Sequence, residues 1–234
     1  MNYEITNNQF PLLKFDMNPN EEIRIQRGSM IYHSPSIRLD FGLNGHGRGL
    51  MKFANAIGRS MATGESSLIT KAIASDYGEI ALAPPMPGDI QDLRVDPDNE
   101  YCINDGAFLA MAGADYNVRT QNLKHSLIGN LSGTGGIFIM ETAGTGTFFV
   151  NSYGSICVLD LNDEEMTIDN QHVVAWSNTL DYDLHFDSGI VRSWGNGEGL
   201  VNTFSGTGSI IIQTLNLQTF ANNLIPFLPG KNNN

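Results

Sequence analysis

The sequence has little charge for its length, and what charge it has is mostly of one sign. Only 16% of its 234 residues are charged, and 25 acidic residues against 13 basic ones give a formal net charge of −12. Proteins that bind DNA or RNA neutralise phosphates with Lys and Arg, so this balance argues against a nucleic-acid partner. Anionic membrane surfaces are disfavoured for the same reason, unless the basic residues cluster.

Cysteine is scarce as well. Cys102 and Cys157 cannot form a disulfide framework or a four-cysteine zinc site, and both stand among apolar residues, where a cysteine is usually small and buried. The first residues lack the basic and apolar regions of a signal peptide. No apolar run approaches the roughly 20 residues of a membrane-spanning helix. We therefore expect a soluble, cytoplasmic protein.

The motifs of familiar enzymes and metal sites are missing too. The five histidines are scattered without a His-x-His or His-x-x-x-His pair, whereas metal ligands normally cluster. There is no Gly-x-Ser-x-Gly elbow, and neither cysteine has a neighbouring base in the sequence. We therefore predict that the protein is not an enzyme and that it has no catalytic residues, no cofactor and no metal.

An internal repeat organises what is present. Three segments align without a gap, each beginning Glu-apolar-x-Ile, and they are residues 22–32, 100–110 and 165–175. Apolar residues alternate with polar ones between Gly, Pro, Asn and Asp turns, which is typical of half-buried strands. We predict a single all-β domain over residues 1–234. Its three repeats, about 12–90, 91–156 and 157–234, are expected to be β-sandwich or barrel-like modules around a pseudo-threefold axis.

Gly-Thr-Gly occurs three times, at 133–135, 144–146 and 206–208. A phosphate-binding loop needs a lysine and a following helix, and these glycines have neither. Gly133 and Gly206 align with Gly64 at the point where we expect a strand to open. Glycine supplies a positive φ or a bulge at such places. We interpret Gly-Thr-Gly as structural and not as a binding loop.

One segment breaks the β pattern and carries a basic surface. Residues 48–61 place apolar residues on one helical stripe and basic residues on the opposite side, which predicts one short amphipathic helix. Arg48, Lys52, Arg59 and Lys71 are four of the chain's 13 basic residues. This basic surface fits an acidic protein partner, a second copy of the chain or a membrane surface. The alternative is an ordinary solvated helix face.

Acidic segments recur at the same place in each repeat, at 16–22, 96–100 and 160–165. The first opens like a calcium loop, but Glu21 and Arg27 stand where that loop needs glycine and glutamate. Asp, Asn and Pro are ordinary turn residues, which favours the interpretation as turns. Weak cation binding at these turns, or a small ligand in a cavity between modules, is the alternative function.

Four segments resemble the motifs of one known family, and they are residues 57–70, 78–90, 168–177 and 197–214. Their combination is similar to the altered-inheritance-of-mitochondria twenty-four family, over about residues 20–214. The resemblance implies a fold like that of the tryptophan RNA-binding attenuation protein, which is related to the double-stranded β-helix and assembles into rings. It also implies a scaffolding role in mitochondrial biogenesis. Thr207 and Leu215 depart from the family's final motif, which usually has a proline and a basic residue there.

These observations predict a non-enzymatic, self-associating β-scaffold or interaction protein, with a second copy or another protein as its partner. RNA binding is not carried over from the attenuation protein, because its basic and tryptophan-binding motifs are not recognisable and the chain is acidic. A metal-dependent enzyme of cupin-like architecture is the least favoured hypothesis, since it would need the missing His-x-His pair.

Overall fold

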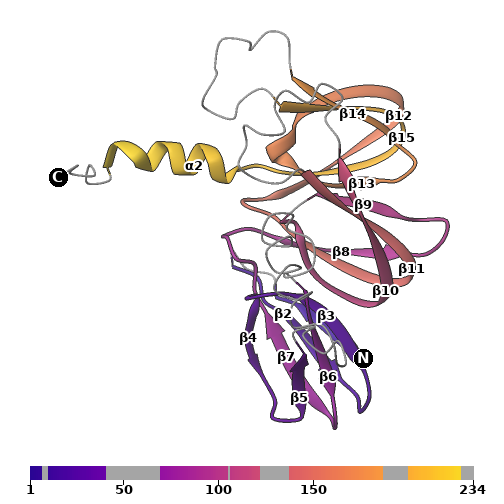
Figure 1. Ribbon diagram of the computed structural model, residues 1–234, viewed down its shortest axis with the longest axis vertical. Coiled ribbons are helices and arrows are strands. Elements are labelled where there is room, and N and C mark those ends of the chain that lie inside the picture. Colours follow the sequence, from indigo (N-terminus) through magenta and orange to yellow (C-terminus); the bar gives the residue numbers. More distant parts are fainter. Residues whose placement is uncertain (7–9, 41–68, 105, 122–136, 187–199, 228–234) are drawn as a thin grey trace, which may run out of the picture.

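Most of the described part of the protein consists of β-strands, as its computed structural model shows (Figure 1). The structure describes residues 1–6, 10–40, 69–104, 106–121, 137–186 and 200–227. The predicted all-β class is therefore confirmed. The helix predicted near 48–61 lies outside the described residues.

The strands fall into three groups along the chain. The first group is β1 (Asn2–Ile5), β2 (Leu13–Met17), β3 (Glu22–Gln26), β4 (Met30–His33), β5 (Ile37–Asp40), β6 (Ile69–Ala74) and β7 (Gly78–Leu82). The second is β8 (Ile90–Val95), β9 (Tyr101–Asn104), β10 (Phe108–Gln121) and β11 (Ile137–Asn151). The third is β12 (Ile156–Asp169), β13 (Val173–Ser177), β14 (Asp181–Phe186) and β15 (Leu200–Gln213), with the single turn η1 (Asn170–His172) between β12 and β13.

Two sheets hold these strands, and all pairs of described strands are antiparallel. The smaller sheet has the order β1-β2-β7-β4. The larger has the order β12-β15-β13-β9-β11-β10-β3-β6-β5, with β14 beside β15 and β8 beside β11. The larger sheet crosses from one group to the next, through β10 with β3 and through β9 with β13. One continuous sheet therefore joins all three groups.

The core follows from the alternation of side chains along the strands. On β2, Leu13, Phe15 and Met17 are buried while the residues between them are more exposed. Three clusters of buried apolar side chains result, and the largest aromatic members include Phe15, Phe148 and Trp176. Phe148 and Phe149 are neighbours on β11 but belong to different clusters, because successive side chains of a strand point to opposite faces. Strand β11 thus connects two of the clusters.

The Gly-Thr-Gly segments lie inside strands and not at their beginnings. Gly144 lies in β11 and Gly206 in β15, with φ of 75° and 114°. Each stands beside a register shift, Gly144 opposite Ala114 and Gly206 opposite Glu164. The prediction that Gly206 opens a strand is therefore wrong: these glycines serve β-bulges, where a positive φ excludes most other residues. Residues 133–135 lie outside the described part of the chain.

Near the end of the described residues lies a helix that the sequence patterns did not predict. Helix α2 (Leu217–Leu224) and the turn η3 (Ile225–Phe227) leave the β-body sideways (Figure 1). Asn216 is its N-cap, since its Oδ1 accepts the N–H of Thr219 at 2.7 Å. Nothing helical in the described part of the chain has the length and hydropathy needed to cross a membrane.

Candidate functional site

The predicted basic surface is not assembled by the described residues. Arg48, Lys52 and Arg59 lie outside them. Lys71 lies on β6, where its Nζ is 3.4 Å from Oε1 of Glu22 on the neighbouring strand β3. Both side chains are about half exposed, and such surface ion pairs contribute at most about 1 kcal/mol. Lys71 therefore has an ordinary surface role in the sheet.

The acidic segments bond to the protein's own donors. Glu21 accepts the N–H of Asn18 at 2.7 Å and pairs with the N-terminal amine at 2.6 Å, and this amine lowers the pKa of Glu21. Asp96 accepts the N–H of Asp98 at 2.9 Å. The third segment is not a separate turn but lies within β12. Among the described residues, no three His, Cys, Asp or Glu side chains are grouped to hold a metal ion.

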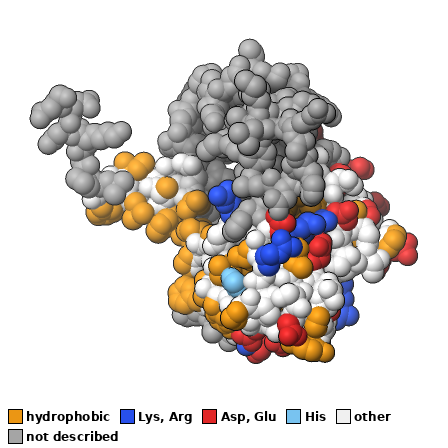
Figure 2. All heavy atoms as spheres, turned by 60° about the horizontal axis from the view of Figure 1, so that its bottom comes forward, with side chains coloured by type: hydrophobic (Ala, Val, Ile, Leu, Met, Phe, Trp, Pro, Cys, Tyr) orange, Lys and Arg blue, Asp and Glu red, His pale blue; other side chains and the backbone are white. Residues whose placement is uncertain are grey.

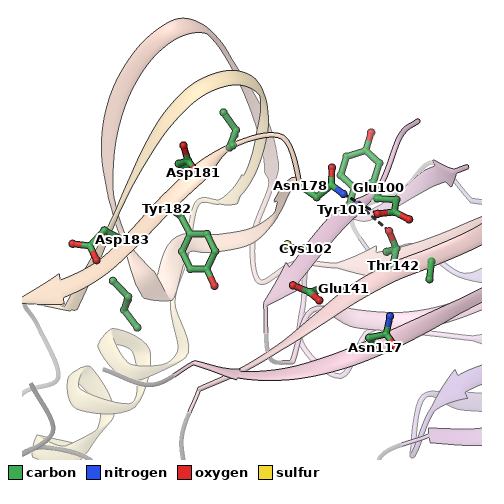
Figure 3. A pocket seen from close by; sticks show the side chains of 13 residues that line it. Glu100, Tyr101, Cys102, Asn117, Glu141, Thr142, Asn178, Asp181, Tyr182 and Asp183 are labelled. Atoms are coloured by element: carbon green, nitrogen blue, oxygen red, sulfur yellow. Dashed lines mark hydrogen bonds between the residues drawn. The ribbon is translucent and has the colours of Figure 1, made fainter. Parts of the chain in front are cut away.

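A polar cavity of about 590 Å³ lies between the second and third groups of strands. Strands β9, β10 and β11 form one wall, and β14 with the turn before it forms the other (Figure 3). The polar and aromatic residues that line it are Glu100, Tyr101, Asn117, Glu141, Thr142, Asn178, Asp181, Tyr182 and Asp183. The alternative function considered from the sequence was the binding of a small ligand in a cavity between modules. This cavity lies between the predicted second and third repeats.

The pairing of β9 brings the two walls together. Cys102 on β9 stands opposite Glu141 on β11 and, on its other side, opposite Trp176 on β13. The turn after β13 is then tied back, because Asn178 donates its side-chain N–H to Oε2 of Glu100 at 2.8 Å. Residues about 80 positions apart in the chain are thereby neighbours at the rim of the cavity (Figure 3).

Two further contacts hold the walls in place. The hydroxyl of Thr142 accepts the N–H of Tyr101 at 2.8 Å, and Thr142 is almost fully buried. The ring of Tyr182 packs edge-on against the buried ring of Trp176, with their centroids 5.0 Å apart. Figure 3 shows Tyr182 and Glu141 extending from opposite walls toward the same space. The lining side chains are therefore positioned by packing and hydrogen bonds.

The charge of the cavity is negative. Among the described residues that line it, four carry carboxylates and none is Lys, Arg or His. Carboxylates gathered in a concave surface attract cations more strongly than they would on an open surface. Tyr182 also lines the cavity, and aromatic rings attract cations. Binding a cationic group, such as an amine or a guanidinium, is the chemistry that this lining fits.

A second candidate surface lies at the end of the chain. The C-terminal apolar segment, residues 215–227, exposes Leu215, Leu217, Phe220, Leu224, Ile225 and Phe227. Figure 2 shows hydrophobic side chains along the element that projects from the body. Contiguous exposed apolar patches of several hundred Å² usually mark interaction surfaces.

The sequence analysis did not predict the residues of either surface. Asn216 followed by apolar residues at 217, 220, 221 and 224 is the local signal for α2, because a cap and a spacing of three and four residues are typical of a short amphipathic helix. The cavity has no such local signal, since its carboxylates come from separate strands. Cys157 also differs from expectation, because it is exposed on β12, whereas Cys102 is buried as predicted.

Comparison with known proteins places this chain among similar sequences and structures. The profile of the family described as mitochondrial biogenesis AIM24 matches residues 3–215. An uncharacterised protein of Streptococcus pyogenes serotype M6 is 48% identical over 226 residues, which are 96% of this chain and 90% of that protein. The crystal structure of a Streptococcus pyogenes protein is similar with a TM-score of 0.82 and 47% identity, over 97% of this chain and 99% of that one. The matched profile ends just before α2.

Proposed function

Because this chain belongs to the mitochondrial biogenesis AIM24 family, we propose that it is a non-enzymatic β-scaffold that associates with itself. The observation that carries the proposal is the C-terminal apolar segment, which is exposed in a chain with a formal net charge of −12. Charge keeps the body apart from other molecules, while apolar surface removed from water drives association. The segment is therefore the part of the described surface best suited to contact another protein.

The proposed scaffold consists of three equivalent units around a pseudo-threefold axis, each similar to the fold of the tryptophan RNA-binding attenuation protein. Contacts of three glycines support this arrangement. A Cβ on Gly78 would meet the hydroxyl of Ser36 at 2.3 Å, one on Gly146 the carbonyl oxygen of Ala112 at 2.3 Å, and one on Gly208 the Cβ of Ser177 at 2.9 Å. In each group of strands a glycine of the last strand thus packs closely on an earlier part of the same group: the segment between β4 and β5, the middle of β10, and the segment from the end of β13 to β14. The sequence pattern instead aligned Gly206 with Gly133 and Gly64, and these two residues lie outside the described part of the chain.

The ends of the units support the same arrangement, because they meet one another. Gly88, between β7 and β8, forms a parallel bridge with Gly154, between β11 and β12. Leu215, which follows β15, donates its N–H to the carbonyl oxygen of Tyr153 at 3.1 Å. Three segments at corresponding places in the sequence are thus neighbours, as a pseudo-threefold axis requires.

Light scattering coupled to size-exclusion chromatography tests self-association. We expect a mass that is a multiple of 25.6 kDa and that falls toward 25.6 kDa on dilution. A mass of one chain at every concentration tested would refute the scaffold proposal. Charge reversal at Arg48, Lys52 and Arg59 tests the basic surface separately, and we expect weaker association with little change in stability.

The acidic cavity favours a second candidate function, the binding of a cationic ligand. Spermidine and arginine are suitable probes, with a neutral sugar as the control ligand. A ligand at one hundred times its Kd adds about 2.7 kcal/mol, or about 5–10 °C in Tm for a chain of this size. Equal Tm values with and without the probes would refute this function.

A matched pair of variants separates specific binding from charge. Glu141→Gln with Asp181→Asn removes two charges from the cavity and should abolish the rise in Tm. Glu164→Gln with Asp163→Asn on β12 removes the same charge from residues that do not line the cavity, and should leave the rise unchanged. Equal effects of both pairs would show that the probes bind only through net charge.

A further inference from the structure

We propose that helix α2 pairs with the α2 of a second copy, so that the two C-terminal apolar segments cover each other around a twofold axis. This inference rests on the proposed self-association and names the surface that carries it. It concerns a part of the chain that lies beyond the matched family profile, which ends at residue 215. The pairing is isologous, which means that both copies use the same patch.

The helix has a clear apolar side and a clear amide side. Leu217, Phe220, Ala221 and Leu224 are spaced by three and four residues, so they lie along one stripe. Gln218, Thr219, Asn222 and Asn223 occupy the other side. The turn η3 continues the apolar stripe with Ile225 and Phe227, which are 62% and 83% exposed. Two such stripes are complementary to each other.

The length of α2 implies that another surface covers it. It has eight residues and none of them is buried. Isolated helices shorter than about 12–15 residues are marginal in water, and in proteins the packing of an apolar face supplies most of their stability. The β-body supplies little of this packing, since the ring contact of Phe220 with Tyr153 leaves Phe220 43% exposed. A partner that buries the stripe would stabilise the helix.

The beginning of the helix is nevertheless anchored, so the apolar stripe has a defined orientation. Nδ1 of His172 lies 2.7 Å from the carbonyl oxygen of Gln213 and donates to it, which leaves Nε2 as an acceptor. Nε2 then accepts the side-chain N–H of Asn216 at 2.9 Å, while Oδ1 of Asn216 caps α2. The helix is thereby held away from the body in a direction that a second copy can meet.

Charge favours a second copy over a membrane as the occupant. Residues 216–227 contain no Asp, Glu, Lys or Arg. Helices that lie on membranes usually carry Lys and Arg on their polar side, and the acidic body would be repelled by anionic lipids. Two uncharged helices, in contrast, can lie side by side without like charges in contact. Each helix is about 12 Å long, which is more than the Debye length of about 8 Å. Two acidic bodies separated by the length of a helix are therefore largely screened from each other's charge.

The exposed area is sufficient for a specific dimer. If a large apolar side chain presents about 200 Å² when fully exposed, the six exposed side chains of the segment leave about 670 Å² per copy. Two copies would then bury about 1,300 Å², within the range of about 1,200–2,000 Å² for stable protein interfaces. The estimate lies near the lower end of that range, so we expect a dimer that dissociates on dilution.

Sedimentation velocity on two matched double variants of the full chain tests the inference. Phe220→Ser with Leu224→Ser removes the centre of the apolar stripe and should raise the dimer Kd by about 100-fold or more, because four large apolar side chains leave the interface. Gln218→Ser with Asn223→Ser changes the amide side and should leave the Kd within about threefold. If the wild-type chain is monomeric, both the scaffold and the pairing are refuted. If the wild-type chain associates and the first variant associates equally well, only the pairing is refuted.

Cross-linking then tests the twofold arrangement. In a Cys157→Ser background, which removes the exposed thiol, Ala221→Cys places a thiol at the middle of the stripe. We expect linked dimers on oxidation, because this position meets its own counterpart across the axis. Asn223→Cys on the amide side should not cross-link. Absence of cross-links at 221 in an associating protein would overturn the isologous pairing.

Flotation with vesicles separates the second copy from a membrane. We expect the wild-type chain to stay unbound with vesicles of phosphatidylcholine alone and with vesicles that also contain phosphatidylserine. Binding to either kind, lost in Phe220→Ser with Leu224→Ser, would assign the stripe to a lipid surface and overturn the pairing.

Discussion

Replacing Gly146 with alanine should destabilise the protein strongly, because no room exists for a side chain there. A Cβ would lie 2.3 Å from the carbonyl oxygen of Ala112 and 2.4 Å from the backbone nitrogen of Ala114, whereas non-bonded heavy atoms prefer about 3.5–4.0 Å. Both partners are backbone atoms of β10, opposite the bulge in β11, so they cannot rotate away as a side chain can. Strands β10 and β11 must separate locally instead. Over-packing of about 1–3 kcal/mol and one or two lost hydrogen bonds of about 1 kcal/mol each predict a loss of about 2–5 kcal/mol.

Urea unfolding followed by circular dichroism measures this loss, with Gly28→Ala as the matched control. Gly28 has a φ of 85°, and nothing lies within 4 Å of the place that a Cβ would occupy, so alanine there meets backbone strain alone. The left-handed conformation costs an ordinary residue about 1–2 kcal/mol. We therefore expect Gly146→Ala to lower the free energy of unfolding by about 2 kcal/mol more than Gly28→Ala does. If the two variants are equally stable, the close approach of β10 and β11 at Gly146 does not constrain the fold.

Three further predictions follow from single side chains. The ammonium of Lys14 lowers the pKa of Glu79. The Glu79 carboxylate therefore stabilises the fold above its unfolded pKa and loses that effect as the pH falls through its folded pKa. Glu79→Gln should flatten the acid side of a stability profile measured by urea unfolding between about pH 3 and 7. Phe204→Ala should reduce the free energy of unfolding by about 3–5 kcal/mol in the same assay, because the ring is fully buried, and a loss below about 1 kcal/mol would contradict its place in the core. Native protein should react with a thiol reagent once, at exposed Cys157, and buried Cys102 should react only after unfolding; two equally fast reactions would contradict the burial of Cys102.

The class of fold was predictable because the alternation of side chains is a local property. Apolar residues at every second position of β2 and β3 indicate which face of each strand is buried, whatever strand lies beside it. Turn residues between such runs mark where strands end. The position of a glycine within a strand, in contrast, could not be predicted from a local pattern. The same Gly-Thr-Gly letters predicted the opening of a strand at 206, yet the bulge there depends on Asp163, an extra residue with a φ of 58° in the opposite strand.

The functional surfaces depend on contacts that no local pattern reports. Glu100, Glu141 and Asp181 share a cavity because β9 pairs with both β11 and β13. Backbone hydrogen bonds make these pairings, and nearly every residue can form them. The sequence of a strand therefore does not show which strands pair with it. Cys157 is exposed for a related reason: β12 is an edge strand that pairs with β15 alone among the described strands.

By itself, the sequence determined that the chain forms strands, which of their faces are apolar, that the charge is acidic, and which family the chain resembles. These properties follow from short-range periodicity and composition, which do not change with the neighbours of a strand. Only the tertiary structure decided that four carboxylates line one cavity and that the apolar stripe of α2 is left uncovered. Both depend on which distant segments pack together, and that choice is made by the free energy of the whole fold and not by any one segment.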